Sequence, residues 1–420
     1  MSSCPPPPAP ASSTAVPYFW LWVLCLLGLD YFSTLAYQPS ITFDVAGRLG
    51  PLATLAVVAA TLFGALPVYC YLAGRPSAGR GSLGLIERYL RGWRGKTAIL
   101  ILLGFTATDF TMLKTLSLAD AAVHVLRSPE TAWQTWLNNV TNRLHDLALV
   151  WFDEKTCAAC NVQMVATLFI GLVSFAFWFL LRRGFNRNVL VLAVPLVTLY
   201  LVMTGMLLAG GIRHLAEHPE RLEEWRDQLA MGDWQVSSRI GADRGWWGIA
   251  ALSLLFLPRL ALGLSGFEMS MMLMPQVKGK TLTRRVWNTR LVLILAALVM
   301  AVYLPASSLV TTLFIPPEAL GEAGVAGNRT LAYLAHGQPL VEPGLILHPW
   351  CGPWFGAVYD IVTVMLLSFA GTSVMTALAG LLPQFLLRFG MDFRWSHRWG
   401  VLLIVFALIN LAVTVHFRAS

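Results

Sequence analysis

Long apolar stretches alternate with short polar connections from residue 18 to residue 417. A helix needs about 20 residues to cross the hydrocarbon core of a bilayer, and nine stretches approach or exceed that length. They cover residues 18–49, 51–73, 97–126, 162–181, 189–212, 246–277, 286–314, 355–389 and 399–417. The pattern predicts an all-α polytopic membrane protein with one transmembrane domain, 18–417, after a disordered tail rich in proline and serine over residues 1–17.

Composition and charge agree with a membrane environment. Hydrophobic residues make up 56% of the 420-residue chain, charged residues make up 12%, and the mean hydropathy is +0.64. A water-soluble domain needs more polar surface than this. The net charge of +8 would suggest nucleic acid for a soluble protein. Here the basic residues lie between the spans, so we expect the lipid bilayer as partner and no nucleic acid.

Basic residues concentrate in every second connection. The connections over residues 75–96, 182–187, 278–285 and 388–398 each hold several lysines or arginines and at most one acidic residue. Because basic loops stay in the cytoplasm, we expect the N-terminus there and the protein in the cell membrane. The long connections 127–161 and 213–245, which mix both signs, are then extracytoplasmic. In the first of them, Cys157 and Cys160 leave a disulfide and inert thiols as open alternatives.

The first predicted span is unusually polar for a membrane helix. Residues 28–39 read Gly-Leu-Asp-Tyr-Phe-Ser-Thr-Leu-Ala-Tyr-Gln-Pro, and polar groups inside a span are costly unless they are paired or hydrated. Pro39 lacks a backbone donor and disfavours helix just before it, so we expect a break near residues 33–37. A broken span exposes backbone groups that can bind solutes and ions. The candidates in this segment are Asp30, Ser33, Thr34 and Tyr37.

The sixth predicted span has a matching feature. Residues 263–269 read Gly-Leu-Ser-Gly-Phe-Glu-Met, which predicts a break near residues 263–266 and makes Ser265, Gly266 and Glu268 candidates. The first and sixth spans each begin a group of five spans. Interruptions in both of them point to the site of an inverted-repeat transporter. Glu268 is expected to be protonated much of the time, because burial disfavours the charged carboxylate. It is therefore the first proton-coupling candidate, ahead of Asp30 and Asp109.

Two further spans carry polar residues. In the third span, Asp109, Asp120 and His124 fall within about 60° of one another on a helix, and Asp109 is the second carboxylate candidate. Lys114 lies on another face. It is either a fixed cation, a proton-exchanging amine, or one half of a structural ion pair with Asp30, Asp109 or Glu268. In the eighth span, Ser368 and Thr372 either line a coupling-ion site or bond to their own helix.

Residues 29–37, 108–110 and 265–268 resemble the first, third and sixth spans of bacterial amino acid permeases and of KUP-type potassium importers. Both groups belong to the amino acid–polyamine–organocation superfamily, and the similarity covers nearly all of residues 18–417. The resemblance implies a LeuT-type fold of two inverted five-helix repeats with broken first and sixth spans. The first repeat covers 18–212, and the second, 246–417, lacks its tenth span. The implied function is solute import by alternating access, usually driven by protons.

In the potassium importers the matching positions supply ion ligands and proton carriers, which here are Asp30, Tyr37, Asp109, Ser265 and Glu268. Two departures matter: Phe110 replaces a common tyrosine, and the nearby Lys114 would repel potassium. We therefore expect a secondary transporter for a small solute. An amino acid is the favoured solute, and the alternative is a symporter that moves potassium together with protons. A non-transporting sensor or truncated remnant is the other alternative, because the tenth span is missing. No metal-ligand cluster, nucleophile elbow or phosphate loop indicates an enzyme, a metal or a cofactor.

Overall fold

The computed structural model describes residues 17–75, 92–128, 162–180, 187–232, 234, 246–261, 265–320, 324–342, 344–388 and 399–416, with a few isolated positions between 135 and 146. Regular structure in these ranges is helical, apart from one isolated bridge. Five helices are long and apolar enough to cross a membrane: Trp20–Ala73, Gly95–Arg127, Leu190–Glu217, Leu282–Phe314 and Pro353–Ser373. The described chain has the architecture of an all-α membrane protein, as its apolar pattern predicts. Cys157 and Cys160 lie outside the described residues.

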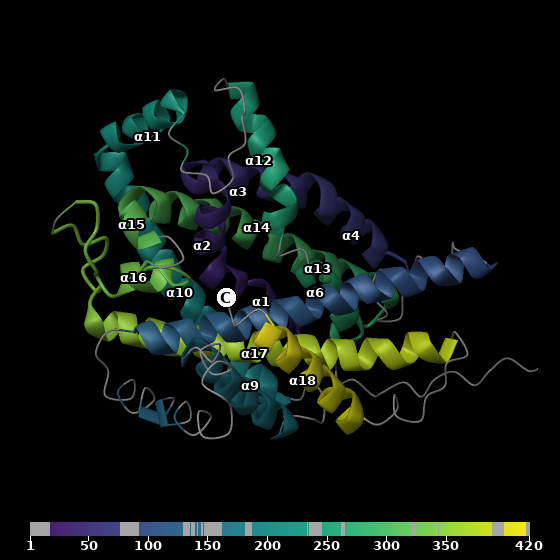
Figure 1. The fold of residues 1–420 in the computed structure, drawn as a ribbon. Helices are drawn as coiled ribbons and strands as arrows, with labels where there is room; N and C mark the ends of the chain where they lie inside the picture. The colour runs from purple at the N-terminus through teal and green to yellow at the C-terminus, as the bar shows by residue number, and fades with distance from the viewer. Residues whose placement is uncertain are drawn as a thin grey trace, which may run out of the picture.

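Each predicted span has helix at its place (Figure 1). The first five are α1 (Trp20–Tyr31) with α2 (Thr34–Ala46), α3 (Gly50–Ala59) with α4 (Leu66–Ala73), α6 (Gly92–Arg127), α9 (Val162–Leu180) and α10 (Arg187–Glu217). The others are α12 (Trp246–Leu260) with α13 (Ser265–Leu273), α14 (Leu282–Phe314), α17 (Pro353–Arg388) and α18 (Trp399–His416). The connections contain α11 (Glu220–Met231), α15 (Pro317–Leu320) and α16 (Thr330–Ala335).

The first predicted span is interrupted at Phe32 and Ser33, between α1 and α2. Beyond this point the Leu35 and Ala36 amides donate to carbonyls only three residues back, those of Phe32 and Ser33. The break begins one residue before the predicted range, and Pro39 lies inside α2. The position of the break is therefore set by the polar turn and not by the proline. The sixth span is described as two helices, α12 and α13, and residues 262–264 between them, where its break is predicted, lie outside the described residues.

The first and sixth spans run antiparallel. At one end, the Tyr18 amide donates to the Gln276 carbonyl at 2.7 Å and the Lys278 amide donates to the Tyr18 carbonyl at 2.8 Å. Farther along, Gln38 Nε2, inside α2, donates to the carbonyl of Leu260, the last residue of α12, at 2.7 Å. Accordingly α1 packs on α13, and α2 packs on α12.

The other spans pair in the same manner. Helix α3 packs on α14, α6 on α17, and α9 on α18, so that four spans each contact the span five places later. Figure 1 shows α6 and α17 side by side. They are antiparallel, because His124 meets Asp360 while Lys114, earlier in α6, lies against Gly371, later in α17.

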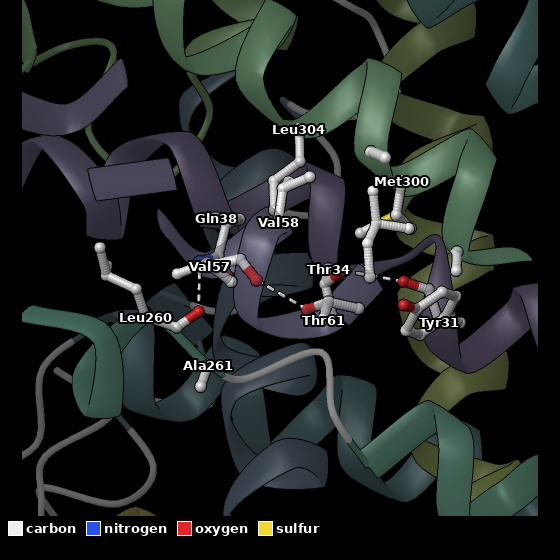
Figure 2. Close-up of a pocket in the computed structure, with 13 residues that line it drawn as sticks. Tyr31, Thr34, Gln38, Val57, Val58, Thr61, Leu260, Ala261, Met300 and Leu304 are labelled. Carbon is white, nitrogen blue, oxygen red and sulfur yellow. Dashed lines mark hydrogen bonds between the residues drawn. The ribbon is translucent and has the colours of Figure 1, made fainter. Parts of the chain in front are cut away.

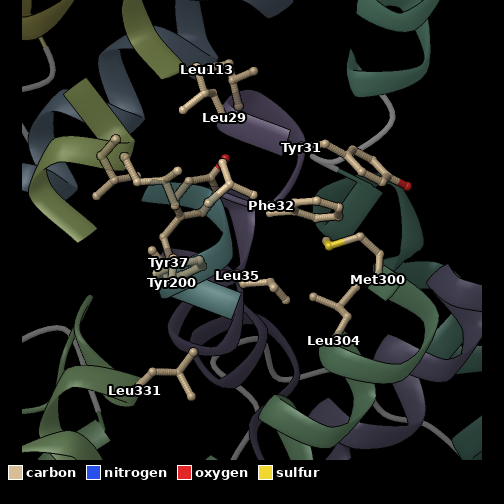
Figure 3. Packing of buried hydrophobic residues seen from close by; sticks show 14 of the residues in the cluster. Leu29, Tyr31, Phe32, Leu35, Tyr37, Leu113, Tyr200, Met300, Leu304 and Leu331 are labelled. Carbon is tan, nitrogen blue, oxygen red and sulfur yellow. The ribbon is translucent and has the colours of Figure 1, made fainter. Parts of the chain in front are cut away.

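The broken first span lies at the centre of the molecule. Its residues are buried almost without interruption from Val23 to Ser40, and Figure 3 shows its aromatic and leucine side chains surrounded by residues of α6, α10, α14 and α16. The outer helices instead expose large apolar side chains, including Phe63, Phe105, Leu172 and Val302. An apolar surface of this kind is unfavourable in water and suits contact with lipid tails. The fold therefore buries the polar first span and exposes apolar side chains of the outer helices on its surface.

Candidate functional site

Asp30, the residue before the last in α1, is the central candidate. Its side chain is 1% exposed, and neither carboxylate oxygen has a hydrogen-bond partner among the described groups. Its neighbours Ser33 and Thr34 donate instead to backbone carbonyls, those of Asp30 and Tyr31, at 2.7 and 2.8 Å. These two hydroxyls compensate for the interrupted backbone bonding, so the carboxylate is the group of this turn that remains available to a ligand.

A small cavity lies between the two breaks (Figure 2). Its volume is about 30 Å³, which is room for one or two water molecules. Tyr31, Thr34 and Gln38 line it from the first span, and Leu260 and Ala261 line it from the sixth. Apolar residues of α3 and α14, with Thr61 and Leu62 of the adjoining π-helical turn (Ala60–Ala65), close it. The cavity fits a water molecule or a bare ion and is too small for an amino acid in this conformation.

The sixth span approaches this cavity through Gly266. A side chain at that position would collide with the ring of Tyr31, so glycine permits the close approach of α13 to α1. The next residue, Phe267, packs edge-on against Tyr31 and stacks on Tyr69 of α4, with ring centroids 5.6 and 5.3 Å apart. Glu268 is buried and accepts a hydrogen bond from the Tyr69 hydroxyl at 3.2 Å. Glu268 is thus tied to α4; the side chain of Ser265 lies outside the described set.

The two candidates on α6, Asp109 and Lys114, lie in different surroundings. Asp109 has an exposed side chain, at the margin of the site, although its charge still reaches the Asp30 carboxylate. Lys114 is buried against Gly371 of α17 and forms no ion pair with any carboxylate in the ranges that the structure describes. Of its three interpretations, the structural ion pair is therefore not observed.

On α17, Thr372 donates to the carbonyl of Phe369 in its own helix at 2.7 Å, and Ser368 is half-buried. These observations do not bring either side chain to the break of the first span. Their assignment to a coupling-ion site stays a prediction.

Sequence reasoning missed a buried charged cluster where α6 and α17 meet the connection that follows α14. We call it the Asp360 cluster; it consists of Asp360, His124, His336 and Arg329. One oxygen of Asp360 lies 2.8 Å from His124 Nδ1, and the other lies 2.8 Å from His336 Nε2 and 3.5 Å from Arg329 Nη2. All four side chains are nearly inaccessible. Burial lowers the pKa of the Arg329 guanidinium, and the adjacent Asp360 carboxylate counteracts this.

A second row of polar groups connects the Asp360 cluster with the break of the first span. His124 Nε2 faces Asp120 Oδ2, one helical turn back, at 4.0 Å. The Asp120 carboxylate interacts electrostatically with the hydroxyl of Tyr37, which also interacts with Asp30. Asp120 Oδ2, His124 Nε2 and the Tyr37 hydroxyl are buried and have no hydrogen-bond partner in the described part of the chain. Only the shared face of Asp120 and His124 was visible in the sequence.

Comparisons with known proteins add nothing to this geometry. No protein-family model matches the chain, and no curated protein matches it at a significant level. The function must therefore be argued from the site itself.

Proposed function

We propose that the chain is a secondary transporter that moves a small solute, most simply an amino acid, across the cytoplasmic membrane by alternating access. The observation that carries this proposal is the antiparallel packing of the first and sixth spans, each described as two helices, where Gln38 bonds to Leu260 and Gly266 meets Tyr31. Interrupted helices that meet at mid-membrane are the usual solute and ion sites of transporters. The packing of four spans on the spans five places later supports two inverted repeats.

The chemistry at the breaks suits an amino acid. The buried Asp30 carboxylate and the carbonyl end of α1 favour an ammonium group, while α13 begins at Ser265 with its amide end, which favours a carboxylate. Opening of the cavity is required, because its present volume of about 30 Å³ admits no amino acid. A potassium–proton symporter is the second candidate, since the unbonded Asp30 oxygens suit a bare cation, although Asp30 itself does not line the cavity.

The orientation proposed from the charges places the N-terminus in the cytoplasm. The bridge between Tyr18 and Val277 supports it, because it holds the start of α1 beside the basic turn at residues 278–285. Single cysteines introduced in that turn should react with a membrane-impermeant thiol reagent only after the cells are opened. Labelling of intact cells would contradict this orientation.

Transport is tested with purified protein in proteoliposomes, using labelled amino acids and a potassium analogue in separate arms, with and without a pH gradient. Wild-type protein is expected to accumulate at least one amino acid, and Asp30→Asn is expected to abolish uptake. The matched control is Asp227→Asn, which removes an exposed carboxylate of α11. Uptake of the potassium analogue alone would favour the symporter. No uptake of either by folded protein would contradict transport and favour a sensor.

A further inference from the structure

The two histidines of the Asp360 cluster have defined protonation patterns. An ionised carboxylate can only accept hydrogen bonds, and Arg329 beside Asp360 favours the ionised form. His124 Nδ1 and His336 Nε2, each 2.8 Å from an Asp360 oxygen, must therefore carry the hydrogens. In a neutral imidazole the other nitrogen is then a bare acceptor. For His124 this acceptor is Nε2.

The bare nitrogen of His124 faces another acceptor. Nε2 lies 4.0 Å from Asp120 Oδ2, and both atoms are buried without a hydrogen-bond partner among the described residues. Two facing acceptors in a buried site repel each other, and each is left without a hydrogen bond. One added proton changes this, because a protonated His124 then forms an ion pair with the Asp120 carboxylate at 4.0 Å, and a shift of about 1 Å closes the pair to a hydrogen bond. The geometry therefore defines a site for a single proton.

This proton site lies between the Asp360 cluster and the proposed solute site around Asp30. On one side His124 contacts Asp360, and on the other Asp120 interacts with the Tyr37 hydroxyl, which Asp30 also reaches. The charged and titratable groups around His124 come from its own helix, α17, α10, α2 and the connection before α17; they are Asp120, Arg127, Asp360, Tyr359, Tyr200, Tyr37, Arg329 and His336. The described side chains of α9, which also packs on α6, contribute none. No metal-binding group of three ligands occurs in the described chain.

We propose that Asp120 and His124 form the proton-binding pair of this transporter, with Asp360 holding the imidazole so that its free nitrogen faces Asp120. A proton from water forms an N–H bond at His124 Nε2, which then faces Asp120 Oδ2, and the same bond breaks when the proton is released. Its arrival cancels the net negative charge of the pair near Tyr37 and Asp30, and so changes how the solute site holds a charged ligand. The inference rests on the proposed function and moves the coupling role from Glu268, which bonds to Tyr69, to α6.

Transport measurements separate coupling from solute binding. A pH gradient of one unit coupled to one proton sustains about tenfold accumulation, since one unit corresponds to a factor of ten. His124→Gln and Asp120→Asn are expected to reduce accumulation to the level without a gradient while exchange of labelled for unlabelled solute continues. His218→Gln and Asp227→Asn, at exposed positions, are the matched controls. Accumulation by His124→Gln equal to that of wild type would overturn the proposal.

A second measurement does not depend on transport. Nitrogen-15 NMR of histidine-labelled protein, with His124→Gln for assignment among the eight histidines, should show His124 with its hydrogen on Nδ1 at high pH and a second proton on Nε2 at low pH. Asp120→Asn should alter the Nε2 signal, and Asp360→Asn should remove the Nδ1 preference. A hydrogen on Nε2 at high pH would overturn the pair, even if the protein transports solute. Wild-type protein that shows the paired signals but no transport would instead overturn the proposed function.

Discussion

Two buried aspartates, Asp30 and Asp360, have the same side chain and nearly the same burial, 1% and 0% exposed, but opposite surroundings. Asp360 has a donor on each carboxylate oxygen, from His124 and His336, and a guanidinium beside it. Asp30 has no donor on either oxygen among the described residues. Because a buried charge is costly unless it is paired, Asp360 holds structure together, whereas Asp30 makes no such stabilising bond to a described residue and under the proposed function serves a ligand or a proton.

Replacing Asp360 should have the largest effect on stability. Asp360→Asn leaves the Arg329 guanidinium buried without its counter-charge, and removing one partner of a buried ion pair costs about 3–5 kcal/mol. Thermal unfolding in detergent should therefore show a strongly lowered midpoint. Asp227→Asn, on the exposed face of α11, should leave the midpoint unchanged. Equal midpoints for Asp360→Asn and wild type would remove the distinction between the two aspartates.

Substitutions at two glycines, Gly356 near Asp360 and Gly266 near Tyr31, test the comparison further. A methyl group at Gly356 would collide with the ring of His336, which Asp360 holds in place, so Gly356→Ala should cost about 1–3 kcal/mol. Gly266→Ala meets the ring of Tyr31, which can shift because it borders the cavity. We expect Gly266→Ala to lower the unfolding midpoint less. Gly104→Ala has open space around it and is the control; a larger effect at Gly266 than at Gly356 would contradict this reasoning.

Replacing Asp30 should affect transport more than stability. Asp30→Asn removes a buried carboxylate that lacks hydrogen bonds, so the protein should be unchanged or stabilised by about 1 kcal/mol. The same unfolding assay measures this, and uptake into proteoliposomes should be lost. Marked destabilisation would show that Asp30 has a structural partner after all.

The smallest expected effect concerns Cys351, a thiol in the connection just before α17. Burial raises the pKa of this thiol, so at pH 8 a smaller fraction is thiolate and alkylation should be slow. Raising the pH should speed the reaction in wild type. Loosening the connection with Asp360→Asn should expose the thiol and speed alkylation at constant pH, whereas Asp30→Asn should not. Mass spectrometry after timed maleimide treatment measures the rates, and equal rates in both variants would argue against a local role for Asp360.

The helices could be predicted from the sequence because each apolar stretch encodes its own span. The predicted start of the fourth span at residue 162 and the predicted end of the seventh at residue 314 coincide with those of α9 and α14. The break in the first span was predicted as well, although Pro39 proved to lie inside α2. A proline removes only one backbone bond, and the packing around α2 tolerates that loss.

The site was predicted less completely, for two reasons. Helical spacing shows which residues share a face but not which part of that face is covered, so the exposure of the Asp109 side chain could not be predicted from the sequence. Contacts between distant segments have no local signal at all. His336 and Arg329 come from a connection and reach Asp360 only through the fold. By contrast, Asp120 and His124 were placed on one face from their spacing, and the structure keeps them together.

The short bridge between Tyr18 and Val277 has a mechanical consequence. Helix α1 is joined to α2 through the turn at Phe32 and Ser33, and the same bridge fastens its other end to the chain just after α13. The start of α1 and the chain just after α13 are therefore coupled mechanically. A rotation of α1 about the turn at Phe32 and Ser33 pulls on the end of α13 through the two backbone hydrogen bonds of Tyr18.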